Sequence, residues 1–290
     1  MDRAAYFGHV DVMRVLIQHG VDLSDAGATG MTPLHAAADR AHVSSINVLV
    51  EAGADVGAED CGGDTPLHLA VGSASVDTVA ALLRHGADAN RVNGDQLSAL
   101  HLAAKSRRGC HVAILLTHEA DPNKMNGNQY YSALHLAAES GSTAIVHALL
   151  AQDAQPNLRG GEDGKAALDL ATVGGHAETV TALVQHRASL NATDKLGPTA
   201  MHAAASYNNA GIIDVLAADG AYVDARDQKS WTPVHVASLH AAAEGGNVSC
   251  VELVLADGVD INFGDNAGST ALHVAAGRSS EVVEKLLQHG

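Results

Sequence analysis

Thr32-Pro33-Leu34-His35 recurs as Thr65-Pro66-Leu67-His68, thirty-three residues further along the chain. Weaker copies of this tetrapeptide follow, and one of them carries an aspartate in place of the histidine. They stand at residues 98–101, 132–135, 166–169, 199–202, 232–235 and 270–273. The steps between successive fourth positions are 33, 33, 34, 34, 33, 33 and 38 residues. A nearly constant step of this length indicates a tandem array of one structural unit.

The residues of each unit predict two helices. Thr32 suits the N-cap of the first helix, because its hydroxyl can accept a hydrogen bond from a free amide of the first turn. Pro33 then occupies the first helical position, where a missing amide proton costs nothing. The second helix carries apolar residues at positions i, i+3 and i+4, as in Ile46, Leu49 and Val50.

The second helix of each unit is expected to end in a left-handed cap. Glycine fills that position in five units, at Gly20, Gly53, Gly86, Gly220 and Gly258. Three middle units carry Glu119, Asp153 and Arg187 there instead. A left-handed non-glycine residue costs roughly 1–2 kcal/mol, so we expect these caps to be strained or rebuilt. The Asp-, Asn- and Gly-rich stretch after each cap predicts a turn or hairpin that leads into the next unit.

The period and the tetrapeptide resemble those of the ankyrin repeat family, and the resemblance covers essentially the whole chain. It implies an all-α solenoid of helix-turn-helix pairs with β-hairpin loops, in about nine repeats that form a single domain over residues 1–290. It also implies that each tetrapeptide histidine hydrogen-bonds the backbone at the start of its repeat. The approximate repeats are 1–23 (truncated), 24–56, 57–89, 90–123, 124–157, 158–190, 191–223, 224–261 and 262–290.

Two features depart from a regular array. In repeat 224–261 the start of the first helix occurs twice, as Val234-His235 and Leu239-His240, so five residues are inserted there. We expect a bulge or a short extra turn before Leu239, and an insertion without a role is the alternative. The chain also starts inside a repeat and stops at Gly290, where a cap glycine is expected. This favours a fragment of a longer protein.

Composition limits the possible partners. The chain is 47% hydrophobic but only 3% aromatic, so its core is expected to consist of Ala, Leu and Val. A net charge of −16 argues against binding to nucleic acid or to an anionic membrane. No apolar stretch follows Met1 and no run approaches ~18 apolar residues, so we expect neither a signal peptide nor a membrane span. Three cysteines without paired spacing suit a reducing compartment, the cytoplasm or the nucleus.

The sequence contains no recognisable catalytic pattern. Eighteen histidines suggest a metal site, but packed helices lie ~8–10 Å apart, so histidines of successive tetrapeptides cannot share one ion. A zinc ion needs each ligand nitrogen at ~2 Å. No Ser/His/Asp constellation or phosphate-binding glycine loop is present either. We therefore expect no enzyme activity, no cofactor and no metal.

The aromatic residues fall outside the packing positions. Tyr131 and Trp231 directly precede the tetrapeptide, whereas Tyr6, Phe7 and Tyr207 fall at the end of a first helix. In ankyrin domains these positions line the concave groove where partners bind. Large exposed aromatic residues on a rigid face commonly anchor protein interfaces. The competing interpretation is that they are surface rings half-packed on their neighbours.

The resemblance and these rings together predict a scaffold or adaptor that binds a partner protein through its concave face and is itself a monomer. The alternative is a regulatory or targeting ankyrin domain of a larger enzyme, channel or ubiquitin-ligase adaptor. Met31, Asp39, Arg40 and Asp64 fall at groove positions as well. The candidate partner-binding residues are Tyr131, Trp231, Tyr207, Tyr130, Tyr6, Phe7, Lys229, Glu139, Gln228, Lys165, Leu97 and Lys105.

Overall fold

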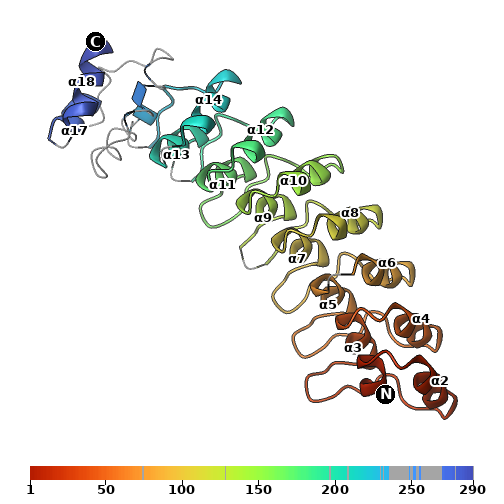
Figure 1. Cartoon of the computed structure of the whole chain (residues 1–290). Helices are drawn as coiled ribbons and strands as arrows, with labels where there is room; N and C mark the ends of the chain where they lie inside the picture. The colour runs from red at the N-terminus through yellow and green to blue at the C-terminus, as the bar shows by residue number, and fades with distance from the viewer. Residues whose placement is uncertain are drawn as a thin grey trace. The chain divides into compact units, whose positions relative to one another are not determined.

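A computed structural model describes most of the chain. The described residues are 1–73, 75–127, 129–195, 197–207, 209–228, 230, 232–234, 248, 251–252, 255, 270–277 and 279–289. Among them the regular elements are all helices (Figure 1), which confirms the predicted all-α repeat fold. The expected β-hairpins appear there only as isolated antiparallel bridges, Val92 with Ser98 and Gly160 with Lys165. The five-residue insertion near residues 235–240 lies outside the described residues.

The chain divides into two compact units, and the first comprises residues 1–136 and 151–154. Its helices form two rows, with α1, α3, α5 and α7 in one and α2, α4, α6 and α8 in the other (Figure 1). The loops between repeats project as fingers beyond the row of first helices. The helices are α1 Asp2–Tyr6, α2 Val10–Gln18, α3 Pro33–Asp39, α4 Val43–Glu51, α5 Pro66–Gly72, α6 Val76–Arg84, α7 Ala99–Lys105 and α8 Gly109–Thr117.

The second unit comprises residues 137–150 and 155–290. Helix α9 begins in the first unit and ends in the second. Within the second unit α11 packs on α13, and α12 packs on both α10 and α14, which repeats the two-row arrangement. The helices are α9 Ala133–Glu139, α10 Thr143–Leu150, α11 Ala167–Val173, α12 Ala177–Gln185, α13 Ala200–Ser206, α14 Ala210–Ala218, α17 Ala271–Ala276 and α18 Ser280–His289.

The tetrapeptide starts the first helix of each repeat and also joins it to the next repeat. The Thr32 backbone amide donates to His35 Nδ1 at 3.1 Å, and the Thr32 hydroxyl lies 2.8 Å from the same nitrogen. The opposite ring nitrogen, Nε2, therefore carries the proton and donates to the Asp64 carbonyl at 2.9 Å. His68 and Leu97 repeat this bond at 3.1 Å. Burial lowers the pKa of both imidazoles, so the network holds neutral rings.

The core confirms the expected packing residues. Helices α4, α6, α8, α10 and α12 each have one completely buried leucine, and the hydrophobic core side chains of the described residues are Ala, Val, Leu, Ile and Met, without Phe, Tyr or Trp. The buried leucines are Leu49, Leu82, Leu115, Leu149 and Leu183. Small alanines on the first helices, such as Ala37 and Ala38, let neighbouring repeats approach closely.

Asparagines rebuild the caps that lack glycine. The left-handed non-glycine caps are Glu119 (φ 63°), Asp153 (φ 60°) and Arg187 (φ 64°). From the turn that follows α6, the Asn90 amide group donates to the Glu119 carbonyl at 2.8 Å and accepts from the Asp121 amide at 2.7 Å. Asn123 and Asn157 donate to the other two caps at 3.0 and 3.3 Å. Side-chain hydrogen bonds from the neighbouring repeat thus offset part of the backbone strain.

A second set of side chains links the repeats at the start of the second helices. His176 Nε2 donates to the Glu139 carbonyl at 3.0 Å, and its ring lies over Gly141. A Cβ at Gly141, whose φ is +66°, would lie 2.5 Å from that ring, so only glycine fits there. His42 makes the equivalent bond to the Tyr6 carbonyl at 3.0 Å. These contacts fix the ends of the first helices.

Asp169 stands where the other repeats have the tetrapeptide histidine. Its Oδ2 accepts from the Ala166 amide at 2.8 Å, which preserves the start of α11. Burial raises the pKa of Asp169 to about 6. A carboxylate has no ring nitrogen with which to reach the next finger, and Arg159 makes that link instead. Its guanidinium donates to the carbonyls of Gly164 and Thr193.

Candidate functional site

Large exposed rings lie at the ends of the first helices and on one finger. Tyr6 closes α1 and Phe7 caps it, and they are 37% and 53% exposed. Tyr207 caps α13 and is 55% exposed. Tyr130 is 63% exposed and has a left-handed backbone, with a φ of +52°. A bulky residue in this conformation is uncommon and costs roughly 1–2 kcal/mol.

Tyr131 is only half-buried rather than fully exposed. Its ring stacks on His135 with centroids 5.2 Å apart and an interplanar angle of 7°. The Tyr131 carbonyl accepts from His101 Nε2 at 3.1 Å. Tyr131 is therefore better described as a surface ring half-packed on its neighbours than as an exposed anchor for a partner protein. Trp231 and Lys229 lie outside the described residues.

The rings of α1 form a cluster with the next repeat. Tyr6 and Phe7 meet edge to face with centroids 5.1 Å apart. The Arg40 guanidinium lies 4.1 Å from the Tyr6 centroid, a cation–π contact, and pairs with Asp39 at 3.2 Å. The cluster is partly held in place because His42 binds the Tyr6 carbonyl.

A groove of about 270 Å³ opens beside this cluster, between α1 and the first finger. Tyr6 and Met31 supply its larger apolar side chains, and Asp2 and Arg3 supply charge. The complete lining is Asp2, Arg3, Tyr6, Gly27, Thr29, Met31 and Ala36. The sequence predicts that Tyr6 and Met31 line a groove, and the structure confirms that they do. It did not predict that Asp2 and Arg3 line the same groove. The truncated first repeat lacks the tetrapeptide that would have given their register.

The predicted polar residues are mostly engaged in structural contacts. Lys165 pairs with Asp163 at 3.5 Å. The Gln228 side chain donates to the Lys195 carbonyl at 2.8 Å, so it joins two fingers. The backbone carbonyls of Leu97 and Glu139 accept from histidines, as described above. The Glu139 side chain is exposed, and so is that of Lys105 at the end of α7.

The predicted residues divide between the two units. The structure brings Tyr6 and Phe7 together with Arg40, but it joins no other predicted rings through a described contact. In unit 1 lie Tyr6, Phe7, Leu97, Lys105, Tyr130 and Tyr131. In unit 2 lie Glu139, Lys165, Tyr207 and Gln228. Among the predicted rings, described contacts to other predicted or groove residues are therefore concentrated at α1.

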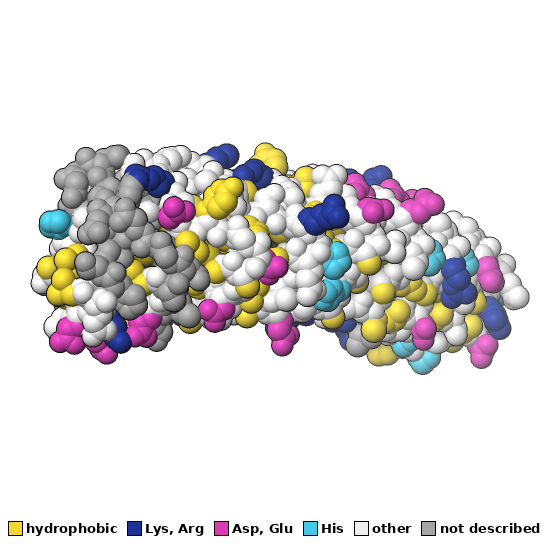
Figure 2. Space-filling model, turned by 90° about the horizontal axis from the view of Figure 1, so that it is seen from above, with side chains coloured by type: hydrophobic (Ala, Val, Ile, Leu, Met, Phe, Trp, Pro, Cys, Tyr) yellow, Lys and Arg dark blue, Asp and Glu magenta, His cyan; other side chains and the backbone are white. Residues whose placement is uncertain are grey.

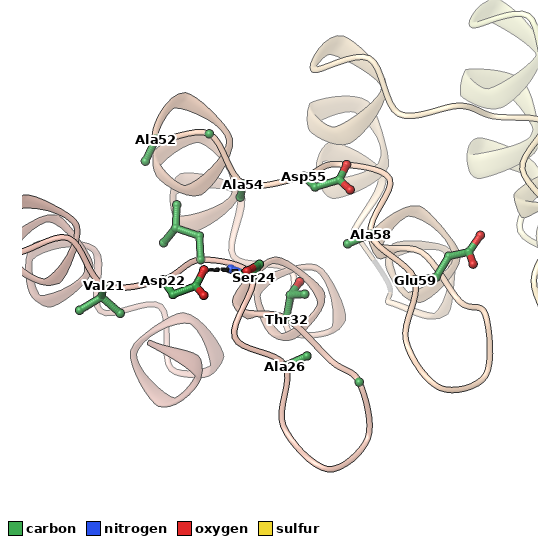
Figure 3. Close-up of a pocket in the computed structure, with 13 residues that line it drawn as sticks. Val21, Asp22, Ser24, Ala26, Thr32, Ala52, Ala54, Asp55, Ala58 and Glu59 are labelled. Carbon is green, nitrogen blue, oxygen red and sulfur yellow. Dashed lines mark hydrogen bonds between the residues drawn. The ribbon is translucent and has the colours of Figure 1, made fainter.

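A larger cavity of about 590 Å³ lies between the turns that follow α2 and α4 (Figure 3). Its acidic side chains already have local partners. Asp22 accepts from the Ser24 amide and hydroxyl at 2.8 and 2.7 Å, which lowers the pKa of Asp22. Asp55 accepts from a turn amide, and Glu59 pairs with Arg91. The cavity is thus a gap between the turns of two consecutive repeats.

Charges of both signs are interspersed on the face shown in Figure 2, together with hydrophobic side chains. Within the described ranges, no three His, Cys, Asp or Glu side chains are grouped closely enough to hold a metal ion. No helix in that part of the chain is long and apolar enough to cross a membrane. Among the described surface features, the apolar groove beside Tyr6 and Phe7 is thus the best candidate for a functional site.

Comparison with known proteins identifies the repeat. A family model described as ankyrin repeats, in three copies, matches residues 1–60, 52–126, 100–194 and 237–290. A model of a single ankyrin repeat matches residues 196–228. A search of curated proteins finds no match. Ankyrin repeats generally act as protein–protein interaction modules. Given the matched residues and the paired helices, this chain belongs to the ankyrin repeat family.

Proposed function

We propose that this protein binds a partner protein along the ends of its first helices and the adjoining fingers, as a scaffold or adaptor without chemistry of its own. The observation that carries the proposal is the groove beside the cluster of Tyr6, Phe7 and Arg40. Its apolar walls, exposed rings and nearby charges are the components of an interface hot spot.

The cluster is preorganised for binding. Arg40 covers one face of the Tyr6 ring, and Phe7 meets its edge, so the ring loses little freedom when a partner packs against it. The groove can receive one medium-sized apolar side chain. Asp2 and Arg3 can then orient the polar backbone or the neighbouring charges of the bound segment.

Long-range charge favours a basic partner. The net charge of −16 raises the encounter rate with a positively charged surface, and added salt weakens this effect. The groove supplies short-range specificity, because an apolar side chain must fit between Tyr6 and Met31. We therefore propose a partner segment with one medium-sized apolar residue flanked by basic residues.

A phage-displayed library of random peptides, selected on the wild-type chain, provides a defined probe. We expect Tyr6→Ala to lower the affinity for the selected peptide about tenfold or more, which corresponds to a loss of ~1.4 kcal/mol or more in binding free energy. Tyr222→Ala is the matched control, because Tyr222 is 63% exposed but follows α14 in unit 2 and does not line the groove. Equal affinities for both variants and the wild type, with unchanged circular dichroism, would refute the proposed groove.

A further inference from the structure

Two histidines of consecutive repeats lie side by side in the second unit. His147 lies in α10 and His186 caps α12, the helix that packs against α10. Both side chains are exposed, and their ring centroids are 5.7 Å apart with an interplanar angle of 63°. They belong to the second helices and are not tetrapeptide histidines. This pair is therefore separate from the groove proposed for partner binding.

One ring nitrogen of His186 is oriented for coordination. Nδ1 lies 2.9 Å from the Ala182 carbonyl, which can only accept, so Nδ1 carries the proton. Nε2 then bears a lone pair and faces away from its own helix. Histidines that bind metals characteristically donate their other ring N–H to a carbonyl in this way, because the bond fixes the tautomer and the ring orientation.

The first unit shows where that Nε2 points. His85 caps α6 as His186 caps α12, and Asn47 is the fifth residue of α4 as His147 is of α10. His85 Nε2 lies 2.9 Å from Asn47 Oδ1. A capping histidine at this repeat position thus directs Nε2 toward the fifth residue of the preceding second helix. In the second unit that residue is His147.

We propose that His147 and His186 bind one divalent transition-metal ion such as Ni²⁺, Zn²⁺ or Cu²⁺, for which imidazole is a favoured ligand. Two imidazoles on one tetrahedral ion hold their ring centroids roughly 5 Å apart, because each nitrogen lies ~2 Å from the metal. The observed 5.7 Å needs only a small rotation of an exposed side chain.

Among the described residues no third His, Cys, Asp or Glu joins this pair. The remaining coordination positions are left for water or for a donor atom from another molecule. From the sequence we expect no metal, because the tetrapeptide histidines are spaced too far apart to share one ion. His147 and His186 occupy different positions of their repeats, and helix packing alone brings them together.

An ion held by both rings would join α10 to α12 and so stabilise two consecutive repeats. Titration of the chelator-treated full chain with Ni²⁺, followed by calorimetry, tests the proposal. We expect His147→Ala and His186→Ala each to lose one bound ion per chain, together with the increase in Tm that Ni²⁺ gives the wild type. His118→Ala is the control, because His118 also caps a second helix with Nδ1 bonded to a carbonyl. The fifth residue of the preceding second helix is Ala80 in this case, and alanine cannot bind a metal ion.

A gain-of-function variant tests the same geometry. Asn47→His places a second histidine opposite His85, and we expect it to add one bound Ni²⁺ per chain. The proposal is overturned if His147→Ala and His186→Ala bind as much Ni²⁺ as the wild type. It is also overturned if His118→Ala loses as much as they do, or if Asn47→His gains no ion.

Discussion

Replacement of Asp169 by asparagine should stabilise the protein at neutral and alkaline pH. Burial raises the pKa of this carboxyl from its ordinary 3.8 to about 6, so the folded chain holds the proton more tightly than the unfolded chain does. At pH 7–8 the folded state must accommodate a buried carboxylate. A difference of this size corresponds to about 3 kcal/mol. Asparagine is uncharged, and its side-chain oxygen can still accept from the Ala166 amide.

The sign of the effect follows from proton linkage. The favourable contribution of protonated Asp169 is complete below pH 3.8 and disappears as the pH rises through about 6. The difference in free energy of unfolding between Asp169→Asn and the wild type should therefore be well below 1 kcal/mol, roughly 0.5 kcal/mol, at pH 4 and approach about 3 kcal/mol at pH 8.

Urea unfolding followed by circular dichroism at several pH values measures this difference, and the other carboxyl groups cancel in the comparison. Asp214→Asn is the control, since it makes the same substitution at an exposed position on α14 of the same unit. A difference for Asp169→Asn that is independent of pH would refute the reasoning. So would a variant less stable than the wild type at pH 8.

Three further outcomes are expected, each measured as a change in free energy of unfolding. Gly141→Ala should be more destabilising than Gly53→Ala, because the new Cβ meets His176 at 2.5 Å whereas nothing lies within 4 Å at Gly53; equal losses would exclude the packing explanation. Asn157→Ala should lower the free energy of unfolding by about 1–3 kcal/mol, because it removes the hydrogen bond to the left-handed cap at Arg187. A variant as stable as the wild type would contradict this. The buried tetrapeptide imidazoles of unit 1 have lowered pKa values, so their stabilisation should be complete above about pH 6.5 and lost as the pH falls. Because protonation of Asp169 acts in the opposite direction, the measurement uses the Asp169→Asn variant, and a urea midpoint of that variant unchanged between pH 7.5 and 5 would contradict this prediction.

The proposed binding surface and the stabilising network meet in the same residues. Tyr6 presents its ring to the groove, while its backbone carbonyl accepts from His42 of the next repeat. The exposed end of this first helix is thus held by a side-chain hydrogen bond from the next repeat. This arrangement allows the surface side chains to differ between repeats without loss of the fold, as expected for a family whose members bind different proteins.

The sequence alone determined the repeat and its internal packing. The step of about 33 residues, the Thr-Pro start and the i, i+3, i+4 pattern are local signals, and local hydrogen bonding and burial decide them. They correctly predicted α3 from Pro33, the buried Leu49 and the left-handed cap at Gly53. Among the described residues, Tyr6, Phe7, Tyr130, Tyr131, Tyr207 and Tyr222 were also correctly placed outside the core.

Contacts between repeats were decided only by the tertiary structure. The Asn157 bond to the Arg187 cap and the His176 bond to the Glu139 carbonyl depend on the distance and rotation between packed elements. The same is true of the approach of His147 to His186 across two helices. A periodic sequence fixes which face each helix buries, but side chains 30 to 40 residues apart meet only after the apolar faces have packed and set the spacing of the repeats.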